Sequence, residues 1–152
     1  MSDLNQIRSK YQGVVLVSFT MVSGSVLFAG LIWFLLSSKN EPAVSNTEMY
    51  RYFAWGASLF VIALSFILKN KFLTNDSQVA KADISKDNII QKLNMSIIIA
   101  MALCEGAVVL GGLIAFLTRN PQDMLVPVIM GLIGFAVHFP RYSDWEHRIK
   151  NN

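Results

Sequence analysis

The chain has 152 residues, of which 53% are hydrophobic and only 15% are charged, a composition typical of a membrane protein with several spans. The net charge of +3 comes from basic residues scattered between apolar runs, so we expect no nucleic-acid partner. A single cysteine excludes an internal disulfide and a cysteine-based zinc site, and the length predicts one membrane domain over residues 1–152.

The first two apolar runs predict membrane-spanning helices over residues 13–37 and 50–68. The first run holds no charge and is longer than the ~20 residues that a helix needs to cross the hydrocarbon core. Trp33 lies near its far end, and Tyr50 and Trp55 lie at the start of the second run. Aromatic side chains in these places are typical of the membrane interface.

Residues 69–95 form the longest polar segment, which we predict to be a cytoplasmic loop. Ser85 could cap a helix within it, in which Ile89, Leu93 and Ile97 recur every four residues and share one face. We therefore expect the third helix to begin outside the membrane and to enter it without a break. The rest of the segment is either a solvated connector or a docking site for a peripheral partner.

The last two apolar runs predict spans over residues 96–118 and 124–139, joined by a short turn that contains Pro121. Pro127 fits the first turn of the fourth helix, and Pro140 ends it. Together the four runs predict an all-α integral membrane protein.

Small side chains recur along the third span on one narrow stripe, at about 100° per residue. Such a stripe lets the backbone of another helix approach closely, so we predict that it is a helix-packing surface. The stripe consists of Ala100, Cys104, Ala107, Gly111 and Ala115.

Lys and Arg are unevenly distributed between the two sides of the membrane. Ten of the 13 lie in residues 1–12, 69–95 and 141–152, which the four spans place on one side. The positive-inside rule puts this side, with both termini, in the cytoplasm. We expect the membrane to be the bacterial inner (plasma) membrane.

The first and third spans resemble each other when they are shifted by 82 residues. The pattern indicates two duplicated helical hairpins in parallel orientation, related by an axis along the membrane normal. The alternative is coincidence between common apolar residues. The matched pairs include Gly24 with Gly106, Gly30 with Gly112, and Lys10 with Lys92.

Glu105 is the one charged residue in the third span and lies close to its middle. A carboxylate at that depth costs at least a few kcal/mol unless it is protonated or paired. It could bind a proton or sodium ion, or hydrogen-bond a hydroxyl such as that of Ser23, Ser58 or Ser65. Ser23 is its counterpart in the shifted match. A third possibility is a basic or polar group on a partner protein.

His138, near the cytoplasmic end of the fourth span, is expected to lie at the interface, although a proton exit path through it is the alternative. We find no paired acids, phosphate loop, Ser-His-Asp set or metal-ligand cluster, so we predict no enzyme, no cofactor and no metal site.

The run from Glu105 to Leu117 resembles the carboxylate helix of the proteolipid c subunits of rotary ATPases. In that helix a glycine follows the acid by six residues and an alanine by ten, as Gly111 and Ala115 do here. The resemblance implies that Glu105 binds a proton or sodium ion in a ring of subunits.

The sequence therefore supports two functions. The first is a non-enzymatic accessory or structural subunit, surrounded by lipid and packed against other membrane helices in a homo- or hetero-oligomer. The second is a proteolipid-like subunit that translocates protons or sodium ions through Glu105. The two differ in whether Glu105 can be replaced by glutamine.

Overall fold

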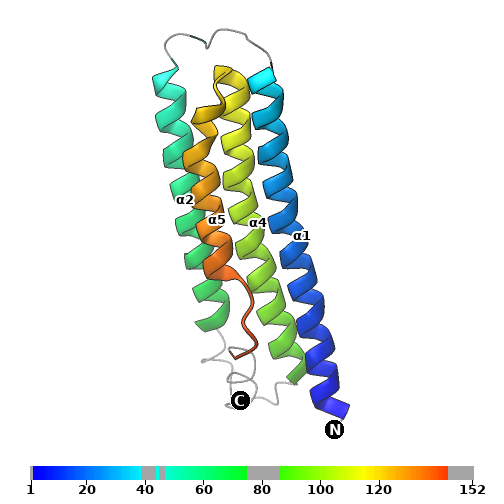
Figure 1. Ribbon diagram of the computed structural model, residues 1–152. Helices are drawn as coiled ribbons and strands as arrows, with labels where there is room; N and C mark the ends of the chain where they lie inside the picture. The colour runs from blue at the N-terminus through cyan, green and yellow to red at the C-terminus, as the bar shows by residue number, and fades with distance from the viewer. Residues whose placement is uncertain (1, 39–43, 45–46, 75–85, 144–152) are drawn as a thin grey trace.

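The computed structural model describes residues 2–38, 44, 47–74 and 86–143, and four helices run along its length (Figure 1). Each span is long and apolar enough to cross a membrane, the last of them formed by a short 3-10 helix together with the helix that follows it. The predicted all-α fold with four membrane helices is confirmed. The elements are α1 (Ser2–Ser38), α2 (Glu48–Thr74), α4 (Lys86–Thr118), η1 (Pro121–Met124) and α5 (Leu125–His138).

The helices extend further into the polar segments than the apolar runs alone predict. α2 continues to Thr74, six residues beyond the predicted end of the span, because nothing in residues 69–74 breaks a helix. α4 begins at Lys86 and continues unbroken to Thr118, which confirms that the third helix starts ahead of its apolar run. The proposed cap, Ser85, lies outside the described residues.

The turn between α4 and α5 is more ordered than a simple loop. Arg119 adopts a left-handed backbone conformation with φ of 55°, which ends α4. Asn120 then caps η1, its side-chain oxygen accepting a hydrogen bond from the backbone N–H of Gln122 at 3.1 Å. At the other end of α5, Phe139 leaves the helical conformation directly before Pro140, as the proline predicts.

α4 is the central helix and packs against α1, α2 and α5 (Figure 1). α4 and α5 form a packed hairpin, but α4 lies between α1 and α2, so these two are not arranged as a second hairpin of the same kind. The all-α bundle is thus shown, whereas the duplication of a hairpin stays a prediction.

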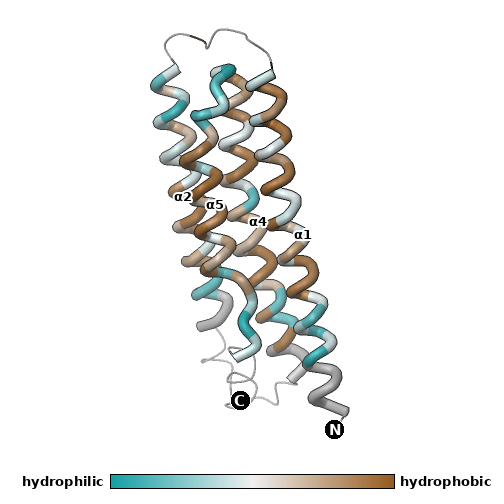
Figure 2. The backbone as a smooth tube through the Cα atoms, viewed as in Figure 1, coloured by the Kyte–Doolittle hydropathy of each residue, from teal (hydrophilic) through white to brown (hydrophobic). Residues whose placement is uncertain are grey.

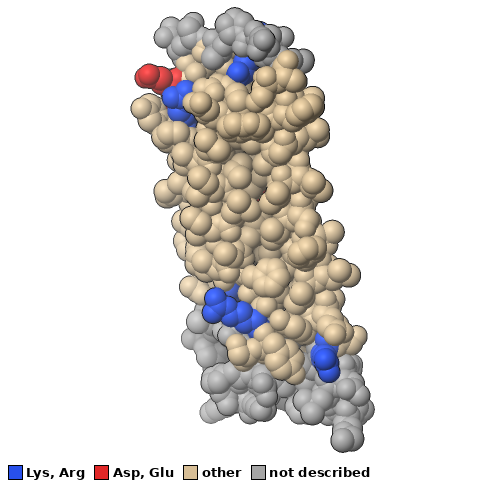
Figure 3. Space-filling model, viewed as in Figure 1, with Lys and Arg blue, Asp and Glu red and all other residues tan. Residues whose placement is uncertain are grey.

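The distribution of polarity along the bundle matches that of a bilayer. Figure 2 shows an apolar band across the middle of the four helices with hydrophilic residues toward the ends, and on the face in Figure 3 Lys and Arg lie only near the two ends. The basic residues at the end that holds the start of α1 and whose side chains are described are Arg8, Lys10, Lys69, Lys71, Lys92 and Arg141.

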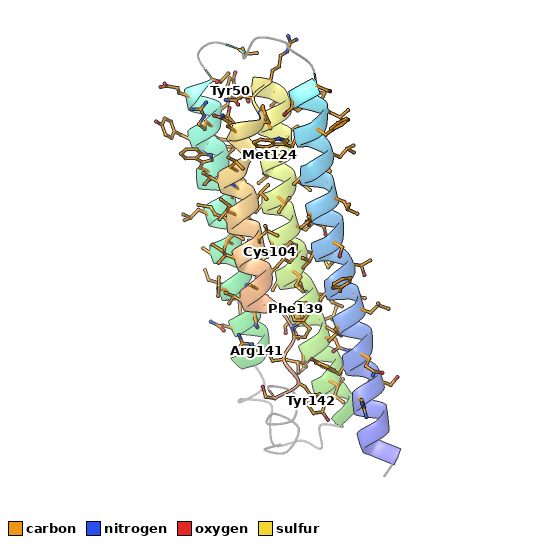
Figure 4. The ribbon with its side chains drawn as sticks, viewed as in Figure 1. Tyr50, Cys104, Met124, Phe139, Arg141 and Tyr142 are labelled. Atoms are coloured by element: carbon orange, nitrogen blue, oxygen red, sulfur yellow. The ribbon has the colours of Figure 1, made fainter. Side chains whose placement is uncertain are left out.

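Residues after α5 are held against α1 at this same end. The hydroxyl of Tyr11 donates a hydrogen bond to the carbonyl oxygen of Pro140 at 3.2 Å. The rings of Tyr11 and Tyr142 meet edge to face, with centroids 5.3 Å apart (Figure 4). The chain is therefore fixed to the bundle where it leaves the fourth span.

Candidate functional site

The small stripe on α4 lies inside the bundle. Four of its members, Ala100, Cys104, Ala107 and Ala115, are 0% exposed, and Gly111 is also buried. The stripe therefore packs against helices of the same chain, and it is not available to a partner protein.

Gly111 lies at a close approach between α4 and the segment formed by η1 and α5. A Cβ atom on Gly111 would lie 2.8 Å from the Cβ of Pro127 and 3.2 Å from the backbone oxygen of Met124. The oxygen belongs to the backbone and cannot rotate away. Only glycine therefore fits here without moving the two helices apart.

Two glycines of α5 complete this contact, and the sequence interpretation did not single them out. A Cβ on Gly131 would lie 2.9 Å from the backbone oxygen of Cys104, and one on Gly134 would lie 2.5 Å from the Cys104 sulfur. Their separation of three residues, on one face of a short apolar helix, is the signal that could have revealed them.

Glu105 lies near the middle of the span Ile90–Thr118, about 20 Å from either end at 1.5 Å per residue. It shares a helix face with Ile98 and Val109, which are 37% and 47% exposed. The residue itself is partly exposed, and no described side chain forms a hydrogen bond or ion pair with it. The carboxyl group is thus at the outer edge of the bundle, at mid-depth.

The hydrogen bond expected between Glu105 and Ser23 of the same chain is not formed. Ser18 and Ser25 mark the buried side of α1, with 0% and 3% exposure, and Ser23 lies about 140–160° round the helix from them. Ser23 therefore faces away from α4. Of the other hydroxyls proposed as partners, that of Ser58 is buried without a hydrogen bond to the described chain.

His138 is buried inside the bundle, with 1% exposure, at the last residue of α5, and its predicted position at the membrane interface stays a prediction. Its Nε2 lies 2.8 Å from Oγ of Ser65 in α2, and Phe66 packs against its ring with centroids 4.6 Å apart. Oγ of Ser65 also donates a hydrogen bond to the Ile62 carbonyl oxygen of its own helix, at 2.6 Å. The thiol of Cys104 lies beside the same hydroxyl.

This arrangement joins α2, α4 and α5 through Ser65. We expect Ser65→Ala to lower the free energy of unfolding by about 1–2 kcal/mol, because it leaves Nε2 of His138 buried without its hydrogen-bond partner. Thermal unfolding in detergent measures the loss. The matched control is Thr20→Ala, which removes a hydroxyl bonded only to the Leu16 carbonyl of its own helix. Equal stability of the two variants would contradict the role assigned to Ser65.

The structure contains an ion pair, at the opposite end of the bundle, that the sequence did not predict. Nε of Arg51 in α2 lies 2.7 Å from Oδ1 of Asp123 in η1, and the two side chains are 32% and 4% exposed. Asn120 also donates a hydrogen bond to Oδ1, at 3.4 Å. The pair ties α2 to the turn between α4 and α5, residues that no local pattern in the sequence connects.

The described side chains bring no three His, Cys, Asp or Glu residues together in a group that could hold a metal ion. Comparison of the chain with protein-family models, with curated proteins and with solved structures finds no match.

Proposed function

We propose that this protein is a non-enzymatic subunit of a membrane complex and that it meets its partner through the surface around Glu105. The small stripe on α4 is buried inside the bundle, where Cys104 and Gly111 lie against α5, so a partner must bind elsewhere. The observation that carries the proposal is the carboxyl group of Glu105. It lies at mid-span on the outer edge of the bundle and has no partner among the described residues.

The physical argument is the cost of leaving this group in hydrocarbon. A carboxyl group at the centre of a bilayer is destabilised by at least a few kcal/mol when nothing there satisfies it. A neighbouring membrane helix with a polar group at the same depth removes that cost. Assembly with such a helix therefore stabilises the complex relative to the isolated subunit.

Two replacements of Glu105 test this proposal. Glutamine keeps the shape and the hydrogen-bonding capacity of the side chain, whereas leucine removes the polar group. We expect native gels of membranes solubilised in mild detergent to show the complex intact for Glu105→Gln and dissociated for Glu105→Leu.

The control for these replacements is Val109→Leu, which alters the apolar surface on the same exposed face without touching the carboxyl group. It should leave the complex intact. An intact complex in the Glu105→Leu variant would overturn the proposed role of the carboxyl group.

A second function, translocation of protons or sodium ions through Glu105, is favoured by the same position at mid-span and by the resemblance of this helix to rotary ATPase proteolipids. It differs in its requirement for a true carboxylate. In that case Glu105→Gln gives an assembled but inactive protein, and a carbodiimide modifies Glu105 selectively. Ion flux into vesicles that contain the purified complex distinguishes the two functions.

We also propose that the protein lies in the bacterial inner membrane with both termini in the cytoplasm. The basis is the excess of Lys and Arg at the end of the bundle where α1 begins and α5 ends. Cysteine labelling in a Cys104→Ala background tests this. An impermeant reagent added to intact cells should label Val44→Cys and leave Asn70→Cys unlabelled, and the opposite pattern would invert the topology.

A further inference from the structure

Ser23 and Glu105 lie at the same depth in the membrane. α1 and α4 run in the same direction (Figure 1), and a Cβ on Gly112 would lie 2.6 Å from Cε1 of Phe28 and 3.6 Å from Cγ1 of Ile32. Gly112 is therefore level with the turn of α1 between these residues. Counting back seven residues on both helices, about 10 Å, brings Glu105 level with the turn that contains Ser23.

The two side chains nevertheless occupy different outer surfaces of the bundle. Ser23 faces away from the buried side of α1, and Glu105 lies at the exposed edge of α4. Both are partly exposed, and neither forms a hydrogen bond with any described residue. Within one chain they cannot meet, because α1 itself stands between the Ser23 hydroxyl and α4.

Each of these surfaces also allows another helix to approach closely. Gly24 follows Ser23, and Gly106 follows Glu105. A Cβ built on either glycine would have no other heavy atom within 4 Å, apart from the adjoining backbone of its own helix. Exposed glycines of this kind permit close contact between helix backbones, which hydrogen bonds between short side chains require.

We propose, on the basis of the proposed function, that the partner at Glu105 is a second copy of this chain. In the contact, the carboxyl group of Glu105 in one copy hydrogen-bonds the Ser23 hydroxyl of the next. The Ser23 hydroxyl can donate a hydrogen bond to a carboxyl oxygen of Glu105, so each group gains a polar partner in place of hydrocarbon. Because each copy uses two different surfaces, the contact is heterologous, and repetition builds a closed ring or an open row.

A second copy fits better than an unrelated helix because it already carries a polar group, the Ser23 hydroxyl, at the depth of Glu105. The neighbouring hydroxyl on α1, that of Thr20, is committed to the Leu16 carbonyl oxygen, whereas Ser23 has no such bond. The same depth match repeats in every copy, so each Glu105 in the assembly finds a hydroxyl except at the end of an open row.

Disulfide crosslinking between two differently tagged copies tests the inference while keeping Ser23 and Glu105 intact. One copy carries Gly24→Cys and the other carries Gly106→Cys, both in a Cys104→Ala background. We expect oxidation in native membranes to join the two tags. The control pairs Gly106→Cys with Ala63→Cys on the exposed surface of α2, which should give only background crosslinking.

A further substitution tests the hydrogen bond itself. Ser23→Ala should lower the crosslink yield several-fold, and Ser23→Thr, which retains the hydroxyl, should restore it. A yield that does not respond to Ser23→Ala would overturn the pairing of Ser23 with Glu105.

The outcomes separate this inference from the proposed function. If the tags do not crosslink while the native complex persists and still depends on Glu105, the partner is a different protein and only the inference fails. If the wild-type protein is a monomer in its membrane, the inference and the proposed function both fail.

Discussion

Replacing Gly111 with leucine is expected to separate α4 from α5 and to destabilise the protein by about 3 kcal/mol or more. Even a Cβ at this position would lie 3.2 Å from the backbone oxygen of Met124 and 2.8 Å from the ring of Pro127. The oxygen has no rotamer to adopt, so the helices must move apart. Cys104, which lies against Gly131 and Gly134 of α5, would then lose part of this contact.

The matched control is Val109→Leu, two residues away on the exposed surface of the same helix. Val109 is 47% exposed, so one more methylene group there does not press against another helix of the same chain and should change stability by less than about 0.5 kcal/mol. Thermal unfolding of both variants in the same detergent compares them. Equal unfolding midpoints for the two variants would show that α4 and α5 are not in close contact at Gly111.

Removal of Arg51 is expected to have the next largest effect. Arg51→Met leaves the carboxylate of Asp123, which is 4% exposed, buried without its counter-ion, at a cost of about 3 kcal/mol. Asp123→Asn should cost less, because Arg51 is 32% exposed and can turn toward water. Unfolding in detergent measures both losses.

The double variant provides the decisive comparison for this ion pair. In Arg51→Met with Asp123→Asn no charge is left buried, so part of the stability lost in Arg51→Met should return. Additive losses from the two single changes would mean that the residues do not interact, and would remove the tie between α2 and η1.

The parts of the fold that the sequence predicted are those set by local pattern. The long apolar runs located all four spans, and the spacing of Ala100, Cys104 and Ala107 located a buried face of α4. The recurrence of Leu93 and Ile97 four residues apart, both of them buried at 5% and 4% exposure, predicted that α4 begins ahead of its apolar run. In each case the information lies within one helix.

The parts that escaped prediction depend on how helices meet. His138 is buried because α2 places Ser65 and Phe66 against it, and nothing near His138 in the sequence indicates this. Arg51 and Asp123 are far apart in the chain and belong to segments predicted separately. Their pairing arises from packing between elements, which hydropathy does not encode.

The directions in which the side chains of Ser23 and Glu105 face also depend on how the helices pack. The shifted match between the first and third spans placed them at equal depth, and the packing of Gly112 against α1 agrees with that register. Depth alone did not give the direction in which each side chain faces. The burial of Ser18 and Ser25 fixes that direction and turns Ser23 outward.

The mass of the wild-type protein, released from its own membrane in mild detergent, tests the central claim most directly. Light scattering that separates protein from detergent gives this mass without any substitution. We predict a species several times heavier than the 17.0 kDa chain, which falls toward 17.0 kDa in the Glu105→Leu variant. A wild-type protein that is already a 17.0 kDa monomer under these conditions would contradict the assignment as a subunit of a membrane complex.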